Sequence, residues 1–155
     1  MAKSWGLPAK GRSEEHTSEL QSPKVISYAV FLGIGLGHSP AMGIPGEELI
    51  IDGLDYIEQS KLNLAGMKIG RNVVVIGAGN TAIDCATIAK RLGAGRVTLA
   101  YRRTEEEMRA YPHEIEFIRK EGVEFRFEMT PESVVIEDGK VMGLACQGEI
   151  GRAHV

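Results

Sequence analysis

The 155-residue sequence has little of what marks several specialised protein classes. Its two cysteines, Cys85 and Cys146, form neither a Cys-x-x-Cys pair nor a metal-binding set, so reduced cytosolic thiols are expected. No apolar run approaches the length of a membrane span. The net charge of −3 gives no reason to expect a nucleic acid or a membrane as partner. We expect a cytoplasmic protein with one domain, a real core and no metal site.

The two ends of the chain also lack the pattern of a folded domain. Residues 12–22 read RSEEHTSELQS, and residues 150–155 read IGRAHV. The adapter-like DNA string AGATCGGAAGAGCACACGTC encodes RSEEHT from its first base and IGRAHV from its third. We therefore expect residues 1–23 to be an artefactual or disordered extension and 149–155 an artefactual tail. Trp5, His16 and His154 are accordingly excluded as site residues.

What the chain does contain is a glycine fingerprint in the right setting. The apolar, β-branched run Val73–Ile76 predicts a buried parallel strand. The next six residues match G-x-G-x-x-G/A, in which the first glycine permits a tight turn and the second lets a pyrophosphate approach the backbone. The final small residue lets the following helix pack closely on its strand. The candidate cofactor-binding residues here are Gly77, Ala78, Gly79, Asn80, Thr81 and Ala82.

The fingerprint lies inside a complete βαβ pattern. A helix is expected over residues 81–92, ended by Gly93 and Gly95, and a second strand over residues 96–101. The unit is about 30 residues long, which is the context that makes a glycine fingerprint informative. The unbonded amides at the helix N-terminus would attract phosphate. This pattern predicts a nucleotide-binding domain rather than an unrelated glycine turn.

Three arginines follow the second strand and bear on the choice of nucleotide. A free ribose 2′-hydroxyl usually meets an acidic residue there, whereas a 2′-phosphate calls for arginine. This chain has Arg102 and Arg103, with Arg109 a few residues on, and the guanidinium fork suits a phosphate. NADP is therefore favoured, with NAD as the alternative, and a solvated basic turn is the non-functional interpretation.

The flanking residues complete an α/β pattern. Before the fingerprint we expect a strand at 28–32, a close-packed glycine crossover at 33–37 and an irregular connection at 41–49. A helix is expected at 52–60 with Leu54 and Ile57 facing inward, and then a loop at 61–70.

After the arginines, Thr104 and Glu107 have the form of a capping box, so the acidic run predicts a helix start rather than a metal site. Pro112 begins a predicted helix to Glu121, with inward positions at Ile115 and Ile118 and a third candidate at Phe117. His113 beside Glu114 is expected to be a surface histidine, because adjacent helix positions do not face one another. A strand at 123–129 and a hairpin over 134–146 with an Asp-Gly turn complete the pattern.

Taken together, these residues resemble a known family over about 24–148. The motifs YAVFLGIGLG, GIPGEEL, VVVIGAGNTAIDCA and VTLAYRR with EEMRAYPHEIEFIRKEGVEF resemble the pyridine-nucleotide domain of two-dinucleotide flavoproteins. The resemblance is greatest to the glutamate synthase small-subunit group, which includes the flavin module of dihydropyrimidine dehydrogenases. It implies a Rossmann-like three-layer α/β domain with a parallel sheet and an antiparallel hairpin excursion, residues 24–65 being a remnant of the flavin-domain crossover.

The resemblance also implies a function. NADPH or NADH would lie across Gly77, Gly79, Asn80 and Thr81, and the three arginines would hold the 2′-phosphate. Hydride would pass to FAD and electrons onward, through a missing flavin-binding half and an iron–sulfur or FMN subunit. The sequence has no flavin fingerprint before residue 71 and no cysteine-rich cluster, so this chain is expected to hold no flavin itself.

Two alternatives remain open from the residues. One is a stand-alone NADP(H)-binding module without catalysis. The other is a dehydrogenase with its own substrate domain, which is disfavoured because no catalytic His, Lys or Tyr constellation follows the βαβ unit. The final electron acceptor is not encoded in these motifs.

Overall fold

The computed structural model describes residues 24–25, 30–32 and 41–148. The expectations for the two terminal segments and for the glycine turn at 33–37 fall outside these ranges. So does the first part of the strand expected at 28–32.

A parallel sheet forms the centre of the described chain. Its strand order is β3-β2-β4-β5-β6, and every neighbouring pair is parallel. The strands are β2 (Val30–Leu32), β3 (Ile51–Asp52), β4 (Asn72–Ile76), β5 (Arg96–Ala100) and β6 (Glu124–Arg126). The predicted strands at 73–76 and 96–101 are thus confirmed, and they pair directly with each other.

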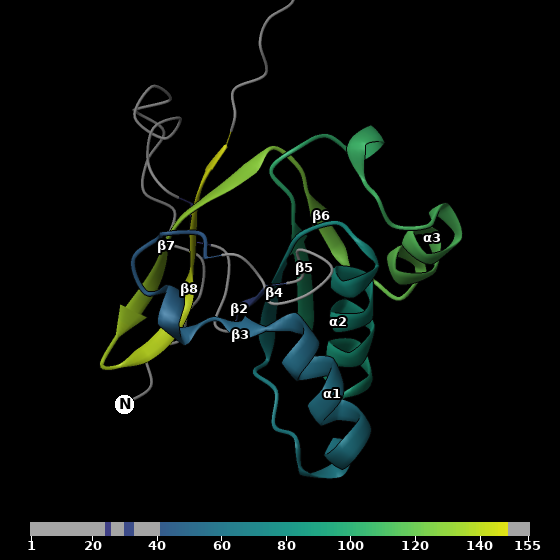
Figure 1. Cartoon of the computed structure of the whole chain (residues 1–155), viewed down its shortest axis with the longest axis horizontal. Helices are drawn as coiled ribbons and strands as arrows, with labels where there is room; N and C mark the ends of the chain where they lie inside the picture. Colours follow the sequence, from purple (N-terminus) through teal and green to yellow (C-terminus); the bar gives the residue numbers. More distant parts are fainter. Residues whose placement is uncertain (1–23, 26–29, 33–40, 149–155) are drawn as a thin grey trace, which may run out of the picture.

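Helices cover one face of this sheet, as Figure 1 shows. They are α1 (Gly53–Asn63), α2 (Asn80–Arg91) and α3 (Pro112–Lys120). The helix expected after the fingerprint is α2, within one residue at each end. Parallel strands need such crossovers, and a sheet covered on both faces carries continuous apolar strands.

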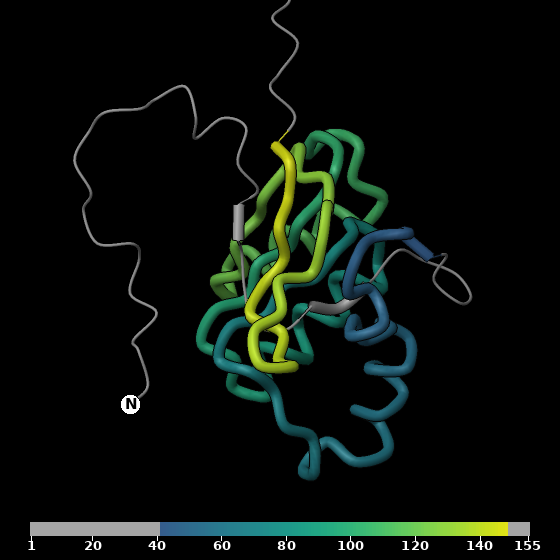
Figure 2. The backbone as a smooth tube through the Cα atoms, turned by 90° about the vertical axis from the view of Figure 1, so that its left-hand side faces the viewer, coloured from purple at the N-terminus to yellow at the C-terminus, as the bar shows by residue number. Residues whose placement is uncertain are grey.

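A second, antiparallel sheet covers the other face. It consists of β1 (Lys24–Val25), β8 (Lys140–Gly148) and β7 (Met129–Glu137), in that order. Figure 2 shows the β7–β8 hairpin, in yellow-green, on the face of the molecule turned toward the viewer. Its turn residues Asp138 and Gly139 have φ of 50° and 71°, the left-handed geometry of a two-residue hairpin. The predicted hairpin is confirmed, with longer strands than its apolar cores indicated.

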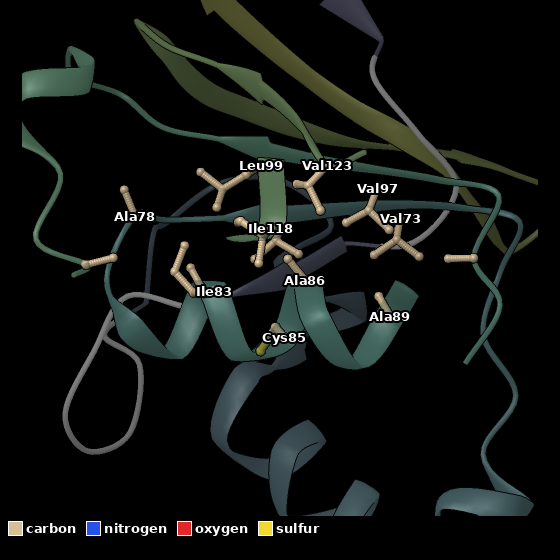
Figure 3. Close-up of a cluster of buried hydrophobic side chains, with 14 of the residues drawn as sticks. Val73, Ala78, Ile83, Cys85, Ala86, Ala89, Val97, Leu99, Ile118 and Val123 are labelled. Atoms are coloured by element: carbon tan, nitrogen blue, oxygen red, sulfur yellow. The ribbon is translucent and has the colours of Figure 1, made fainter. Parts of the chain in front are cut away.

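The alternation of β4 explains how three layers form. Val73 and Val75 point into a core with α2, whereas Val74 and Ile76 point into a second core with the hairpin. All four side chains are buried. Figure 3 shows the first core, in which small residues of α2 such as Ala86 and Ala89 lie against the sheet. The expected three-layer α/β domain with its antiparallel excursion is therefore present.

The helix before β4 differs from the expectation in length and phase. α1 continues to Asn63 and passes into a 3-10 turn at Leu64–Gly66, where a loop was predicted. The side chain of Asp52 caps the helix by accepting the N–H groups of Leu54 and Asp55. That start places Tyr56 in the core and leaves Leu54 37% exposed, so the prediction for Leu54 was wrong.

The segment after the arginines also needs two corrections. Glu107 accepts the backbone N–H of Thr104 at 3.3 Å, as the capping box requires, but the turn it caps is a short 3-10 helix, Glu105–Glu107. In α3, Ile118 is fully buried while Phe117 is 49% exposed. Successive helix positions are about 100° apart, so Phe117 cannot share the inward face of Ile118.

The strand expected at 123–129 divides in two. β6 covers only Glu124–Arg126, and Met129 already belongs to the antiparallel sheet. Glu128 has a positive φ of 56°, which redirects the chain from one sheet to the other.

Candidate nucleotide-binding site

The glycine fingerprint forms the turn between β4 and α2. Gly77 has φ of 125°, a conformation that L side chains rarely adopt, and its N–H donates to the Ala100 carbonyl at 2.9 Å. That bond fixes the end of β4 against the end of β5. Ala82 has no exposed surface and belongs to the core between α2 and the sheet, the packing position that its small size predicted.

Gly79 leaves open space at the start of α2. Beyond Gly79 itself and its neighbours along the chain, no described atom lies within 4 Å of the position that a Cβ would occupy there. Its carbonyl accepts the N–H groups of Ala82 and Ile83, so the helical hydrogen bonds begin at Ala82. The N–H groups of Asn80 and Thr81 belong to the first turn, which lacks acceptors inside the helix and is suited to an anion.

The arginines lie on the adjacent chain segment. The N–H of Tyr101 donates to the Arg126 carbonyl at 2.8 Å, which holds this segment at the end of β5. Arg102 and Arg103 are exposed, and Arg103 forms an ion pair with Glu107 at 3.5 Å. Arg109 is brought back to the fingerprint because its own N–H donates to the Ala78 carbonyl at 3.1 Å. Within the described ranges, Arg102 and Arg109 make no salt bridge.

A cavity of about 480 Å³ joins these two segments. Six of the nine candidate residues line it, namely Gly77, Ala78, Gly79, Arg102, Arg103 and Arg109. The remaining three do not: Asn80 and Thr81 lie in the first turn of α2, and Ala82 is in the core. Every charged residue that lines the cavity within the described part of the chain is an arginine, so this lining favours an anionic ligand.

The other wall of the cavity was not predicted. It consists of Ala41, Met42 and Ile44 from the connection before β3, together with Thr130 and Pro131 of β7. Tyr101 contributes between the arginines and the sheet. One feature of the sequence indicated this part of the cavity: two apolar residues, Met42 and Ile44, lie inside a glycine- and proline-rich connection.

The other reactive side chains of the described chain do not line this cavity. Burial raises the pKa of the Cys85 and Cys146 thiols to about 12. His113 is exposed and stacks on Tyr111, as expected of a surface histidine. Among the described residues, no group of His, Cys, Asp and Glu could hold a metal ion. Nor is any helix in those ranges long and apolar enough to cross a membrane.

Comparison with known proteins identifies the family. The model of the pyridine nucleotide-disulphide oxidoreductases matches residues 11–152. The chain is 39% identical to the NADPH-Fe(3+) oxidoreductase subunit beta of Geobacter sulfurreducens, over 76% of this chain and 18% of the relative. It is 40% identical to the glutamate synthase [NADPH] small chain of Halomonas elongata, over 71% of this chain and 26% of the relative. The chain thus spans roughly a fifth to a quarter of the length of these relatives.

Comparison of structures agrees at the level of the fold. The crystal structure of T. acidophilum thioredoxin reductase superposes with a TM-score of 0.55 at 19% identity, covering 80% of this chain and 38% of that one. The fingerprint, its cavity and these matches confirm the expected relationship, which includes glutamate synthase small chains. The chain belongs to the pyridine nucleotide-disulphide oxidoreductase family.

Proposed function

We propose that this chain is the NADPH-binding part of a flavin-dependent oxidoreductase. The observation that carries the proposal is a cavity lined by both the fingerprint backbone and three arginines. A dinucleotide phosphate needs both features, namely close backbone approach for its pyrophosphate and cationic groups for its 2′-phosphate. The names of the relatives, which include NADPH-dependent oxidoreductases, support the same assignment.

The residues present fit the nucleotide. The open space at Gly79 leaves room for a pyrophosphate against the backbone, with the first-turn amides of α2 as donors. Arg102 and Arg109 have no carboxylate partner within the described chain, so a phosphate would not have to displace one. Arg103 would have to share its guanidinium with Glu107.

When bound, NADPH supplies a hydride, and the protein supplies position and electrostatics. This chain would hold the dinucleotide through its backbone and orient it by the 2′-phosphate. Among the described residues that line the cavity, only Tyr101 and Thr130 carry a hydroxyl group, and none of those residues is a carboxylate, a histidine or a cysteine. The flavin would be held by a separate half of the parent protein, and this chain alone would hold none.

The parent would pass electrons to a further subunit carrying an iron–sulfur cluster or FMN, in the cytoplasm. The relatives support the existence of a partner subunit, since one relative is named a subunit beta and another a small chain. Fold and family do not choose the final acceptor.

The decisive test is a calorimetric titration of this chain with NADPH and, separately, with NADH. We expect tighter binding of NADPH. Replacing Arg102 by Ala should lower the affinity for NADPH by about tenfold, which is the value of one charge-assisted hydrogen bond. The affinity for NADH should change by less than about twofold.

Arg91→Ala is the matched control, because it removes the same charge from the far end of α2. An α-helix rises about 1.5 Å per residue, so Arg91 lies roughly 16 Å from the fingerprint. Equal affinities for the two nucleotides in the unaltered chain would contradict the 2′-phosphate assignment. Failure to bind either one would contradict the nucleotide site.

A further inference from the structure

Glu47 holds the loop that forms the second wall of the cavity. Its carboxylate accepts the backbone N–H of Met42 with one oxygen and that of Gly43, at 2.8 Å, with the other. We call residues 41–44 the cavity loop, because Ala41, Met42 and Ile44 line the same cavity as the fingerprint. Glu47 itself does not line it.

The cavity loop has a shape that needs support. Gly43 is exposed and has φ of 70°, in the left-handed region. Met42 and Ile44, on either side, pack against the hairpin-side core that contains Ile76, Ala100 and Val134. The two side chains thus anchor the loop on one surface, while its backbone at Met42 and Gly43 is directed at Glu47.

The base of the loop is fixed separately. The Pro45 carbonyl accepts the N–H of Val134 in β7 at 2.8 Å. Gly46 lies so close to β7 that a Cβ there would come within 2.8 Å of the Val134 Cβ. The base therefore stays docked on the hairpin without Glu47, and the carboxylate acts on the part of the loop that faces the cavity.

We propose that Glu47 is a positioning residue for nucleotide binding, which sets the cavity loop in place without touching the ligand. The inference rests on the proposed function, because it names a residue that prepares the same cavity. The hydrogen bond from Met42, with those from Gly43 and Ile44, lowers the pKa of Glu47, as expected for a carboxylate held as an anion by amides.

If Glu47 positions the loop, its removal should change NADPH affinity in the direction opposite to that expected from its charge alone. Removing a carboxylate near an anion site should strengthen binding through the field alone. Removing the carboxylate that holds the loop should weaken it. A glutamine at this position has one acceptor oxygen and one NH₂ group, so it can satisfy one of the two backbone donors and opposes the other.

The test compares Glu47→Gln with Glu48→Gln, which makes the same charge change at an exposed neighbouring residue. Amide hydrogen exchange is followed by NMR at Met42 and Gly43 without ligand, and NADPH affinity is measured by calorimetry. We expect Glu47→Gln to raise the hydrogen-exchange rate of both amides. It should also lower NADPH affinity about threefold to tenfold, in line with the loss of one or two hydrogen bonds. Glu48→Gln should change neither.

Each contrary result has a distinct meaning. Unchanged exchange at Met42 and Gly43, or equal or tighter NADPH binding by Glu47→Gln, would overturn the positioning role. Exchange that also rises across β4 would mean general loss of stability and would overturn it as well. If the unaltered chain binds no nucleotide, the proposed function fails and Glu47 has no positioning role in binding. The exchange data then still show whether it holds the loop.

Discussion

Ala78 and Arg109 are joined through their backbones, at 3.1 Å between the Arg109 nitrogen and the Ala78 carbonyl oxygen. Ala110 donates to the same carbonyl at the same distance. The middle residue of the fingerprint turn therefore fixes where a segment 31 positions later returns to the cavity. Because the bond uses main-chain atoms, it does not depend on the arginine side chain.

Because of this relationship, a substitution of the Arg109 side chain tests the proposed 2′-phosphate site without disturbing the backbone. Arg109→Ala should leave the unfolding free energy within about 0.5 kcal/mol, as for most exposed side chains. NADPH affinity should fall by about threefold to tenfold, with NADH little changed, because a charged hydrogen-bond donor is lost. Denaturant unfolding and calorimetry measure the two quantities. An equal loss for both nucleotides would show that Arg109 does not read the 2′-phosphate.

The two fingerprint glycines should respond differently to alanine. At Gly79 there is open space and φ is −96°, so we expect Gly79→Ala to fold normally. The added methyl group would contact the pyrophosphate, and NADPH affinity should therefore fall by tenfold or more, about 1.4 kcal/mol. At Gly77 φ is 125°, so Gly77→Ala should cost about 1–3 kcal/mol of stability. Thermal unfolding with calorimetry separates the effects. Normal NADPH binding by a folded Gly79→Ala would argue against pyrophosphate at this turn.

Glu107 offers a substitution expected to improve binding. It pairs with Arg103 at 3.5 Å and also accepts the Thr104 N–H. Glu107→Gln removes the charge, while glutamine remains an acceptable capping-box residue. We expect tighter NADPH binding, by about twofold, since exposed ion pairs are worth roughly 1 kcal/mol or less. Glu106→Gln, an adjacent exposed position, controls for net charge, and an equal gain there would show that the pairing with Arg103 is irrelevant.

The buried thiols predict how stability depends on pH. Burial raises the pKa of Cys85 and Cys146 to about 12, whereas an unfolded thiol ionises near about 8.5. The unfolded state therefore loses these protons first, so the folded state is fully favoured below about pH 8.5 and loses stability as pH rises toward 12. Denaturant unfolding at increasing pH should show this decline, and it should be shallower in Cys85→Ala/Cys146→Ala. A parallel decline in that double variant would assign the effect to other groups.

Local sequence patterns predicted the strand–turn–helix unit of the fingerprint better than the cavity beside it. Val73–Ile76 and the six fingerprint residues are adjacent in sequence, and their spacing alone places a turn at the start of a helix. The inward face of α1 was harder to predict from the sequence. The cap at Asp52 and the packing against α2 turn Tyr56, rather than Leu54, toward the core. The wall formed by Met42 and Thr130 could not be predicted, since the hairpin brings together residues almost 90 positions apart.

The arginine segment is fastened to the fold at both ends by main-chain bonds, from Tyr101 to Arg126 and from Arg109 to Ala78. Its side chains can consequently change without disturbing the attachments. An exchange of NADPH for NADH at the proposed site would therefore require changes at only two or three exposed positions between residues 102 and 109. In the proposed site, the main chain would set where the nucleotide lies, and the exposed side chains would set which nucleotide binds.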